Sequence, residues 1–399
     1  MKKNIPLIIK ITKLILRGEI MSEKELENFN SVANIKVIGV GGGGNNSIEG
    51  ILDSKIDGLE FIVANTDKQI LDKFDKSLTL QLGDKRGIGA GANPEVGKKA
   101  AEHSIQEIRE KLKNANLVVV TAGMGGGTGT GASPVIAKIA KEQKALVIAI
   151  VTTPFSFEGA KRNKVANEGI EELKKYVDSY IVISNEKLRE SYGDVSYGDA
   201  FKIADNVVKQ FIRTVVDIIA VPGLVNLDLA DLDTLIRNCG ETVIGIGNAN
   251  GENAAQLAMK NAISSPILQS SIKGVTKAIV YFSSAKNSSI NDFEKAIEEL
   301  RKVAGQDIDI IFGIGKPVNE DAEKLGETYV SVIATGKKEE TQDEDFQTVD
   351  QNYDLKNSIY KTREFLKVTN SLTFENSENH LDSENLNDDD LNLIYNRYS

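Results

Sequence analysis

The sequence predicts an α/β protein in which a parallel-sheet domain is joined by a long central helix to a smaller α/β domain. Short apolar runs alternate with helical segments from residue 35 onward, which is typical of a parallel sheet covered on both faces. Two glycine clusters each follow a strand and open a helix. After Gly336 the chain is rich in Glu, Asp, Asn and Ser, so we expect residues 337–399 to form a disordered acidic tail.

The composition narrows the classes of function. The 399 residues carry a net charge of -10, which argues against broad binding to nucleic acid. The single cysteine, Cys239, excludes an internal disulfide and a multi-cysteine zinc site, and it suits a cytosolic protein. Only two histidines are present, so histidine metal clusters and Ser-His-Asp catalysis are poorly supported. We therefore expect chemistry based on carboxylates, amides, arginines, backbone groups and a metal.

The first element along the chain is a basic, apolar extension, residues 1–31. Its first twenty residues are interrupted by charge too often to span a bilayer. They also lack a good signal-peptide cleavage site. Two interpretations stay open: translation begins at Met21, or the segment forms an amphipathic helix at a membrane surface. Neither requires direct membrane insertion.

The first predicted domain, residues 32–198, is an α/β unit. Its strands and helices are predicted from apolar runs and helical periodicity. The strands are Ile35–Val40, Glu60–Ala64, Leu117–Thr121, Leu146–Val151 and Ser179–Ile183, and the clearest helices are Pro94–Lys113 and Pro134–Glu142.

The central helix and the second domain follow. An amphipathic run from Asp199 to Ile219 predicts a long helix within residues 199–221, and Pro222 ends it because proline cannot continue the hydrogen-bond ladder. Residues 222–336 form the predicted second domain. Its strands are Val243–Ile246, Ala278–Phe282, Asp309–Phe312 and Tyr329–Ala334.

The first glycine cluster runs from Gly39 to Asn46, directly after a strand. Glycines let the backbone approach a phosphate and present its N–H groups, and a helix N-terminus favours negative charge. The spacing also fits the dinucleotide fingerprint of dehydrogenases, and Asp67, after the second strand, keeps that alternative open at this point.

The second glycine cluster decides between these alternatives. Gly123 to Gly131 contains six glycines in nine residues, after a strand and before a helix. A tight turn does not need so many glycines, and helix propensity opposes them. Two dense phosphate loops in one sheet indicate a triphosphate rather than a dinucleotide. No GxxxxGK[ST] loop or NKxD motif is present, so the site is not of the P-loop type.

Residues 125–131, Gly-Gly-Gly-Thr-Gly-Thr-Gly, resemble the signature loop of the tubulin/FtsZ superfamily. Five other segments match that family in order and spacing across residues 32–336: Gly41–Asn46, Asn65–Asp67, Gly89–Glu95, Thr153–Arg162 and Pro222–Asp231. The resemblance implies a tubulin-like fold and a GTPase that polymerises head to tail into filaments. It also implies a place in the cytoplasmic, mid-cell division ring of bacteria.

The resemblance further implies which residues bind GTP or GDP. The phosphate contacts would come from Gly42, Gly43, Gly44, Asn45, Asn46, Gly125, Gly126, Gly127, Thr128, Gly129 and Thr130. Asn46 would reach the base, Thr130 either donates to phosphate or caps the next helix, and Ala90–Ala92 would lie near the terminal phosphate.

The ribose and base contacts are implied in the same way. Glu158 would contact ribose and Arg162 would reach phosphate or sugar, although a plain i,i+4 ion pair explains their spacing equally well. Asn185 and Asp205 resemble guanine readers, and Phe201 would stack on the base. No metal ligand is assigned among the side chains; Mg²⁺ would sit on the phosphate oxygens.

Asn226, Asp228 and Asp231 are the predicted catalytic residues. In the resembling family this loop enters the nucleotide pocket of the next subunit, where carboxylates polarise the attacking water. The alternative is that Asp228 is a helix N-cap with Asp231 in the first turn. A non-hydrolysing scaffold of the same superfamily is also possible in principle, and retention of all three residues argues against it.

Three departures from the family pattern are visible, and the tail is the least constrained region. Asn45 takes the place of a glycine, Ser47 replaces a small alanine, and Ala160 stands where a basic residue is common. The end of the tail, residues 390–397, has the acidic, apolar and basic order of a peptide that docks on membrane-anchoring division proteins, or it is simply an unstructured acidic end.

Overall fold

The computed structural model of the chain describes residues 33–52, 59–192, 196–220, 224–225, 227–264, 272–284, 289–315 and 327–336. Four predicted features lie outside the described residues. These are the N-terminal extension up to residue 32, the helix stop at Val221–Gly223, Asn226, and the tail with its partner-binding end.

Ten strands of the described chain form one sheet, in the order β3-β2-β1-β4-β5-β6-β7-β10-β8-β9. Their bounds are β1 Ile35–Val40, β2 Leu59–Asn65, β3 Thr79–Gln81, β4 Leu117–Gly123, β5 Leu146–Thr153, β6 Ser179–Ser184, β7 Gly240–Ala249, β8 Lys277–Ser283, β9 Asp309–Gly315 and β10 Thr328–Thr335. The stretch from β3 to β6 is wholly parallel, as predicted.

The sheet consists of two halves with a narrow joint. β6 and β7 pair only at Ser179 with Gly240 and at Tyr180 with Glu241. Beyond the joint, β10 runs antiparallel to both β7 and β8, and β9 runs parallel to β8. The predicted two-part α/β architecture is therefore confirmed, with an antiparallel strand in the smaller half.

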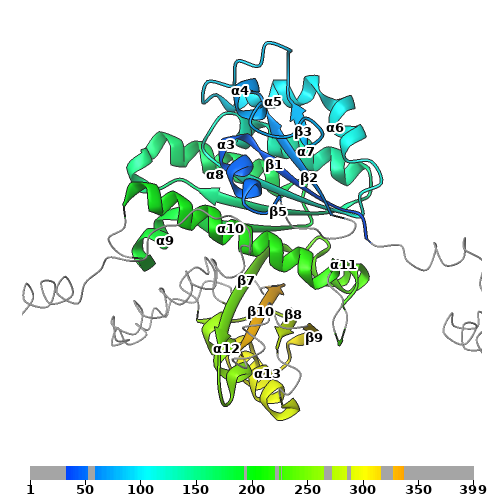
Figure 1. Cartoon of the computed structure of the whole chain (residues 1–399), viewed down its shortest axis with the longest axis vertical. Coiled ribbons are helices and arrows are strands. Elements are labelled where there is room, and N and C mark those ends of the chain that lie inside the picture. The colour runs from blue at the N-terminus through cyan, green and yellow to red at the C-terminus, as the bar shows by residue number, and fades with distance from the viewer. Residues whose placement is uncertain are drawn as a thin grey trace, which may run out of the picture.

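Helices cover both halves, and one long helix lies between them (Figure 1). Their bounds are α3 Gly41–Glu49, α4 Lys68–Leu71, α5 Pro94–His103, α6 Ile105–Lys111, α7 Thr128–Glu142, η1 (3-10) Ser156–Glu158, α8 Ala160–Lys174, α9 Asn185–Tyr192, α10 Tyr197–Ala220, α11 Leu229–Ile236, α12 Ala254–Ile263 and α13 Ile290–Ala304. The 24 residues of α10 extend over roughly 36 Å at 1.5 Å per residue.

Alternation along the strands divides the interior into separate cores. In β4, Leu117 and Val119 face the core that α10 fills, whereas Val118 and Val120 face the core under α7. The α10 core also receives Ile279 and Ile333 from the smaller half, so this helix packs on both halves. A third core lies between the smaller half and its helices α12 and α13.

Two predicted helices differ from the observed ones by more than two residues, and both differences concern residues that contact neighbouring elements. The predicted Pro94–Lys113 helix is two helices that break at Ser104, whose buried hydroxyl accepts the Gly83 N–H at 2.9 Å. Side-chain hydrogen bonds of this kind compete with the helix ladder.

The helix predicted to begin at Pro134 begins six residues earlier, at Thr128, and keeps Pro134 inside it. Its start is rich in glycine because α5 packs so closely against it that only small residues fit. A side chain on Gly131 would overlap the Pro94 carbonyl oxygen of α5. Close packing thus overrides low helix propensity. The three-residue edge strand β3 was not predicted.

Within the described residues, no helix combines the length and the apolar character needed to cross a bilayer.

Candidate functional site

Two glycine-rich turns lie side by side at one edge of the sheet. β1 and β4 are parallel neighbours in register, with Val40 opposite Ala122, so their carboxyl ends meet at that edge. β1 runs directly into α3, and β4 leads through its glycine turn into α7. A Cβ on Gly41 would lie 2.7 Å from the Gly129 nitrogen, so the two helix starts nearly touch.

The starts of α3 and α7 suit a polyanion. Neither helix has a side-chain cap or an acidic residue in its first turn. The first-turn N–H groups of a helix lack intrahelical partners, and the helix dipole favours negative charge there. A Cβ placed on Gly42 or Gly126 would find nothing within 4 Å, so space is open in front of both turns. The arrangement fits a chain of phosphates that bridges two helix N-termini.

The two threonines of the second turn have different surroundings. The Thr128 hydroxyl is partly exposed and lies 2.6 Å from that of Thr66. The Thr130 hydroxyl is buried and accepts the Gly125 N–H at 2.8 Å. Thr130 therefore closes the turn from inside, a task that differs from both predicted alternatives, and Thr128 remains at the surface of the site.

Asn45 and Asn46 also separate. The fully buried Asn45 amide donates to the carbonyls of Gly39 and Ala64 and accepts from Asn65. The Asn45 side chain therefore ties α3 to β1 and β2, which leaves the predicted phosphate contact to its backbone N–H group. Asn46 is exposed and is the asparagine available to a ligand.

The loop before α5 rests against the second glycine turn. A Cβ on Gly127 would lie 2.8 Å from both the Ala90 Cβ and the Asn93 nitrogen. Asn93 caps α5 by accepting the Glu95 N–H. Ala92 has a positive φ of 56° and is exposed. This places the predicted loop beside the phosphate turn.

Glu158 and Arg162 form the ion pair that their spacing predicts. Arg162 Nη1 lies 2.7 Å from Glu158 Oε2, and Glu158 also accepts the Phe155 N–H at 2.9 Å. A Cβ on Gly125 would lie 2.8 Å from the Arg162 Cγ, so this pair borders the second glycine turn. The ion pair therefore lies beside the second glycine turn, where it could contact a ligand bound in front of that turn.

A second polar group lies where α10 meets the first half of the sheet. Asn185, at the start of α9, is 6% exposed, and its Oδ1 has no hydrogen-bond partner within the described part of the chain. Asp205 lies on α10 with Oδ1 at 3.4 Å from the Ser47 hydroxyl of α3. Burial raises the pKa of Asp205 to about 6, while Lys209 and Ser47 lower it. The unpartnered Asn185 oxygen and the Asp205 carboxylate, which has acceptor capacity beyond its contact with Ser47, suit a ligand with several N–H donors.

Aromatic residues complete this region. The Phe201 ring meets the edge of the fully buried Phe155 ring, with centroids 5.0 Å apart, and Phe155 stacks on Phe157 at 5.0 Å. Glu186 of α9 accepts the Ser156 N–H at 2.8 Å. Together these contacts bring α9, α10 and η1 to the same end of the molecule.

The predicted catalytic residues Asp228 and Asp231 belong to the start of α11. This helix lies at the other end of α10 (Figure 1). Asp228 is the N-cap of α11 and forms a capping box with Asp231. The Asp228 N–H donates to the Asp231 carboxylate at 3.0 Å, and the Asp231 N–H donates to the Asp228 carboxylate at 2.9 Å. The interpretation as an N-cap is therefore correct. From Asp205 to the end of α10 at Ala220 the helix rises roughly 22 Å. Asp228 and Asp231 are thus far from the nucleotide end of their own chain.

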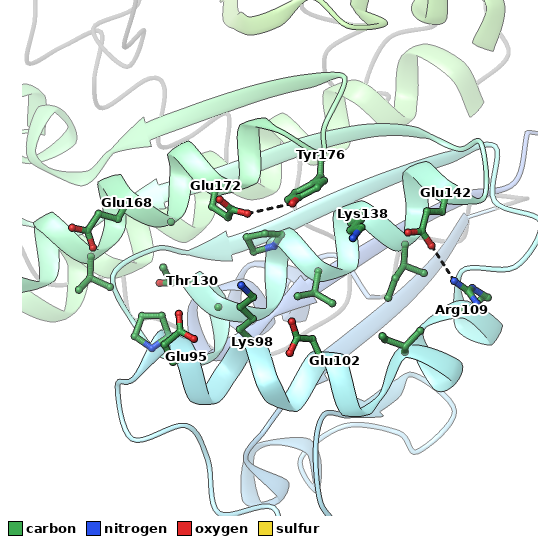
Figure 2. Close-up of a pocket in the computed structure, with 18 residues that line it drawn as sticks. Glu95, Lys98, Glu102, Arg109, Thr130, Lys138, Glu142, Glu168, Glu172 and Tyr176 are labelled. Atoms are coloured by element: carbon green, nitrogen blue, oxygen red, sulfur yellow. Dashed lines mark hydrogen bonds and ion pairs between the residues drawn. The ribbon is translucent and has the colours of Figure 1, made fainter.

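Two further cavities border the predicted site residues only in part, and Thr130 is the predicted site residue that lines the first of them. A groove of about 560 Å³ runs between α5–α6, α7 and α8, and charged side chains such as Glu95, Lys98 and Glu172 line it (Figure 2). A shallow depression of about 780 Å³ beside α11 is lined by Leu229, Ala230 and residues 114–116, among others. Among the described residues, no group of three or more His, Cys, Asp or Glu side chains could hold a metal ion.

Comparisons with known proteins agree along the chain. The Tubulin/FtsZ family GTPase domain matches residues 34–193, and the FtsZ family C-terminal domain matches residues 240–338. The chain is 53% identical over 314 residues to the cell division protein FtsZ of Mycoplasmopsis pulmonis, covering 78% of this chain and 79% of that protein.

Solved structures agree as well. An empty FtsZ dimer from M. jannaschii superposes with a TM-score of 0.72 at 35% identity, covering 79% of this chain and 93% of the other. The GDP-bound monomer of CetZ1 from Haloferax volcanii, at 18% identity and a TM-score of 0.64, covers 84% of this chain and 99% of the other and shares the fold.

Proposed function

This chain belongs to the tubulin/FtsZ family of GTPases, and we propose that it is a division protein that polymerises head to tail, with each active site built from two subunits. The observation that carries the proposal is the separation of the two half-sites by the length of α10. The glycine turns lie at one end of this helix, and Asp228 and Asp231 follow its other end.

The nucleotide half binds GTP or GDP through three zones. The helix starts around Gly42 and Gly126 hold the phosphates, and Glu158 with Arg162 borders them on the ribose side. Asn185 and Asp205 accept from the N–H groups of guanine, for which their unpartnered or half-buried oxygens are suited. Phe201 provides an apolar surface beside the base.

Mg²⁺ would be held mainly by phosphate oxygens and water, since this ion commonly takes only one or two protein ligands in such sites. When bound, it would neutralise charge on the β and γ phosphates.

The acidic half orients the water that attacks the γ-phosphate. Asp228 Oδ1 and Asp231 Oδ2 are engaged in the capping box, so the second oxygen of each carboxylate remains able to accept from water. Each carboxylate is fixed by the cap, and a fixed acceptor is what positioning of a nucleophile requires. The proposal extends to Asn226, which lies outside the described residues.

Both ends of the molecule carry exposed apolar side chains, as an assembly contact requires. Ile88 is 79% exposed and Phe157 is 55% exposed near the nucleotide end. Leu224, 73% exposed, and Phe312 lie beyond the other end of α10, where Val225 pairs with Ile314 of β9. A contact between two different faces extends into a filament rather than closing into a ring of two.

We further propose that the filaments act in the cytoplasm at the mid-cell division ring and that the tail, residues 337–399, docks on membrane-anchoring division proteins. The likeness to a cell division protein supports the first part. The sequence order at residues 390–397 supports the second.

The decisive experiment measures phosphate release per subunit against protein concentration with GTP and Mg²⁺. A two-subunit site gives a steep rise above a threshold concentration, in step with sedimentable polymer. A rate per subunit that is independent of concentration would show that each chain hydrolyses GTP alone and would overturn the composite site.

A further inference from the structure

Ser47 lies on α3, between the first glycine turn and the Asp205 carboxylate. It is a buried residue of α3, at 3% exposure. Its hydroxyl oxygen is 3.0 Å from the Gly43 carbonyl oxygen and 3.4 Å from Asp205 Oδ1. The single hydroxyl proton is therefore shared between two acceptors, the Gly43 carbonyl in the first glycine turn and the Asp205 carboxylate on α10.

Resting on the proposed function, we infer that Ser47 is a positioning residue for guanine recognition. Its hydroxyl holds the Asp205 carboxylate in the orientation that accepts from both the N1–H and the N2–H of guanine. Ser47 touches no ligand itself; it acts through Asp205.

The surroundings of Asp205 predict that the contact with Ser47 affects the pH dependence of guanine binding. Burial raises the pKa of Asp205 to about 6, and the next causes are Lys209 of α10 and Ser47, which lower it, and Glu49 of α3, which raises it. A carboxylate accepts from both guanine N–H groups only when it is ionised. Guanine affinity should therefore be full at alkaline pH and fall as the pH drops through about 6. Without the Ser47 hydroxyl, one lowering cause is lost and the fall begins at higher pH.

The second glycine turn supplies a matched control. Ser133 of α7 is fully buried, and its hydroxyl donates to the Gly129 carbonyl four residues earlier, as Ser47 does to Gly43. Within the described part of the chain, Ser133 has no carboxylate partner. Ser133→Ala removes the same kind of helix hydroxyl without touching Asp205.

The test compares wild type, Ser47→Ala, Ser47→Thr and Ser133→Ala, each as the full chain below its assembly threshold. The dissociation constants of GDP and inosine diphosphate are measured from about pH 5.5 to 8.5. Inosine diphosphate lacks the 2-amino group and reports the second hydrogen bond.

We expect Ser47→Ala to move the pH midpoint of GDP binding upward by about half to one unit. Its preference for GDP over inosine diphosphate should fall about threefold at pH 7. Ser47→Thr, which keeps the hydroxyl, should restore both properties, and Ser133→Ala should leave both at the wild-type values.

Two results would overturn the inference. One is a Ser47→Ala protein with the wild-type pH midpoint and the wild-type base preference. The other is an equal shift in Ser133→Ala, which would reduce the effect to helix packing. Failure of the wild type to bind any guanine nucleotide is a different outcome, because it removes the proposed function and the inference together.

Discussion

The two ends of α10 are built by different means. At the proposed nucleotide end, the phosphate contacts would come largely from backbone groups of two glycine turns, whose positions follow from the register of β1 and β4. At the acidic end, the working groups are two side chains, and each is engaged in starting α11. The first end is fixed by the sheet and the second by a local cap.

This difference separates binding from catalysis within one chain. Backbone cradles are complete in the monomer and need no rearrangement to accept a ligand. The carboxylates of the cap have a structural task in the monomer and, on the proposed mechanism, acquire a chemical one only at a junction. Changes at the two ends should therefore produce distinct defects.

The largest expected effect is at the acidic end. Asp231→Ala should retain GTP binding and lose about 10²- to 10⁴-fold in hydrolysis rate, which is the usual contribution of a positioned base. Binding is measured by nucleotide titration and hydrolysis by phosphate release in preformed polymer. Near wild-type turnover in intact filaments would refute the role of Asp231.

The corresponding change at the nucleotide end is Gly126→Asp. A Cβ at this position meets no atom within 4 Å, and the added charge would lie at the proposed phosphate site, so GTP affinity should fall about ten- to hundredfold. Gly126→Ala is the matched control and should bind almost normally. Equal losses in both variants would mean that size, rather than charge, is limiting.

Mixing these two variants sharpens the comparison. Asp231→Ala supplies a sound nucleotide half and Gly126→Asp supplies a sound acidic half. If each site spans two chains, the mixture hydrolyses GTP faster than the sum of its parts. Strict additivity at concentrations where mixed polymer forms would place both halves in one chain.

Asp228 allows the cap and the chemistry to be separated. Asparagine is as good an N-cap as aspartate, so Asp228→Asn should keep the stability of the fold while hydrolysis falls. Asp228→Ala should lose hydrolysis and also destabilise the fold by about 0.5–2 kcal/mol. Thermal unfolding and phosphate release, measured on the same samples, distinguish the two. A fully active Asp228→Asn would limit this residue to capping.

The smallest effect is expected at the exposed apolar rim. Ile88→Ser should raise the assembly threshold severalfold while changing unfolding stability by less than about 0.5 kcal/mol. Ile290→Ser on α13 removes an equally exposed isoleucine, at 81%, away from both ends of α10. A similar change in threshold for both variants would indicate general solubility rather than a junction.

Much of the fold could be predicted from the sequence because buried parallel strands are continuous apolar runs. The predicted Ile35–Val40 strand has the bounds of β1, and α10 extends only two residues before and one after the prediction. The missed strand β3 has three residues, too few for periodicity to register. The start of α7 was missed because its glycines are chosen for packing against α5 rather than for helix propensity.

For the candidate site, the sequence indicated which residue types gather at the glycine turns, but it did not indicate which way their side chains point. Glycine spacing located both turns, but it could not reveal that the Asn45 and Thr130 side chains point into the protein, since that depends on contacts with Gly39, Ala64 and Gly125. The contact between Ser47 and Asp205 joins residues 158 positions apart. No local sequence pattern encodes such a contact.

Because the half-sites lie at opposite ends of one helix, the two ends of a filament of these molecules would differ chemically. On the proposed mechanism, every interior copy would receive acid groups from a neighbour, but the copy whose nucleotide face is terminal would receive none. That last molecule keeps its triphosphate for as long as nothing joins it. Addition of a new molecule at that end would thus start GTP hydrolysis in the molecule that it covers. The nucleotide state at each position, GTP or GDP, would then reflect the time since the next molecule was added.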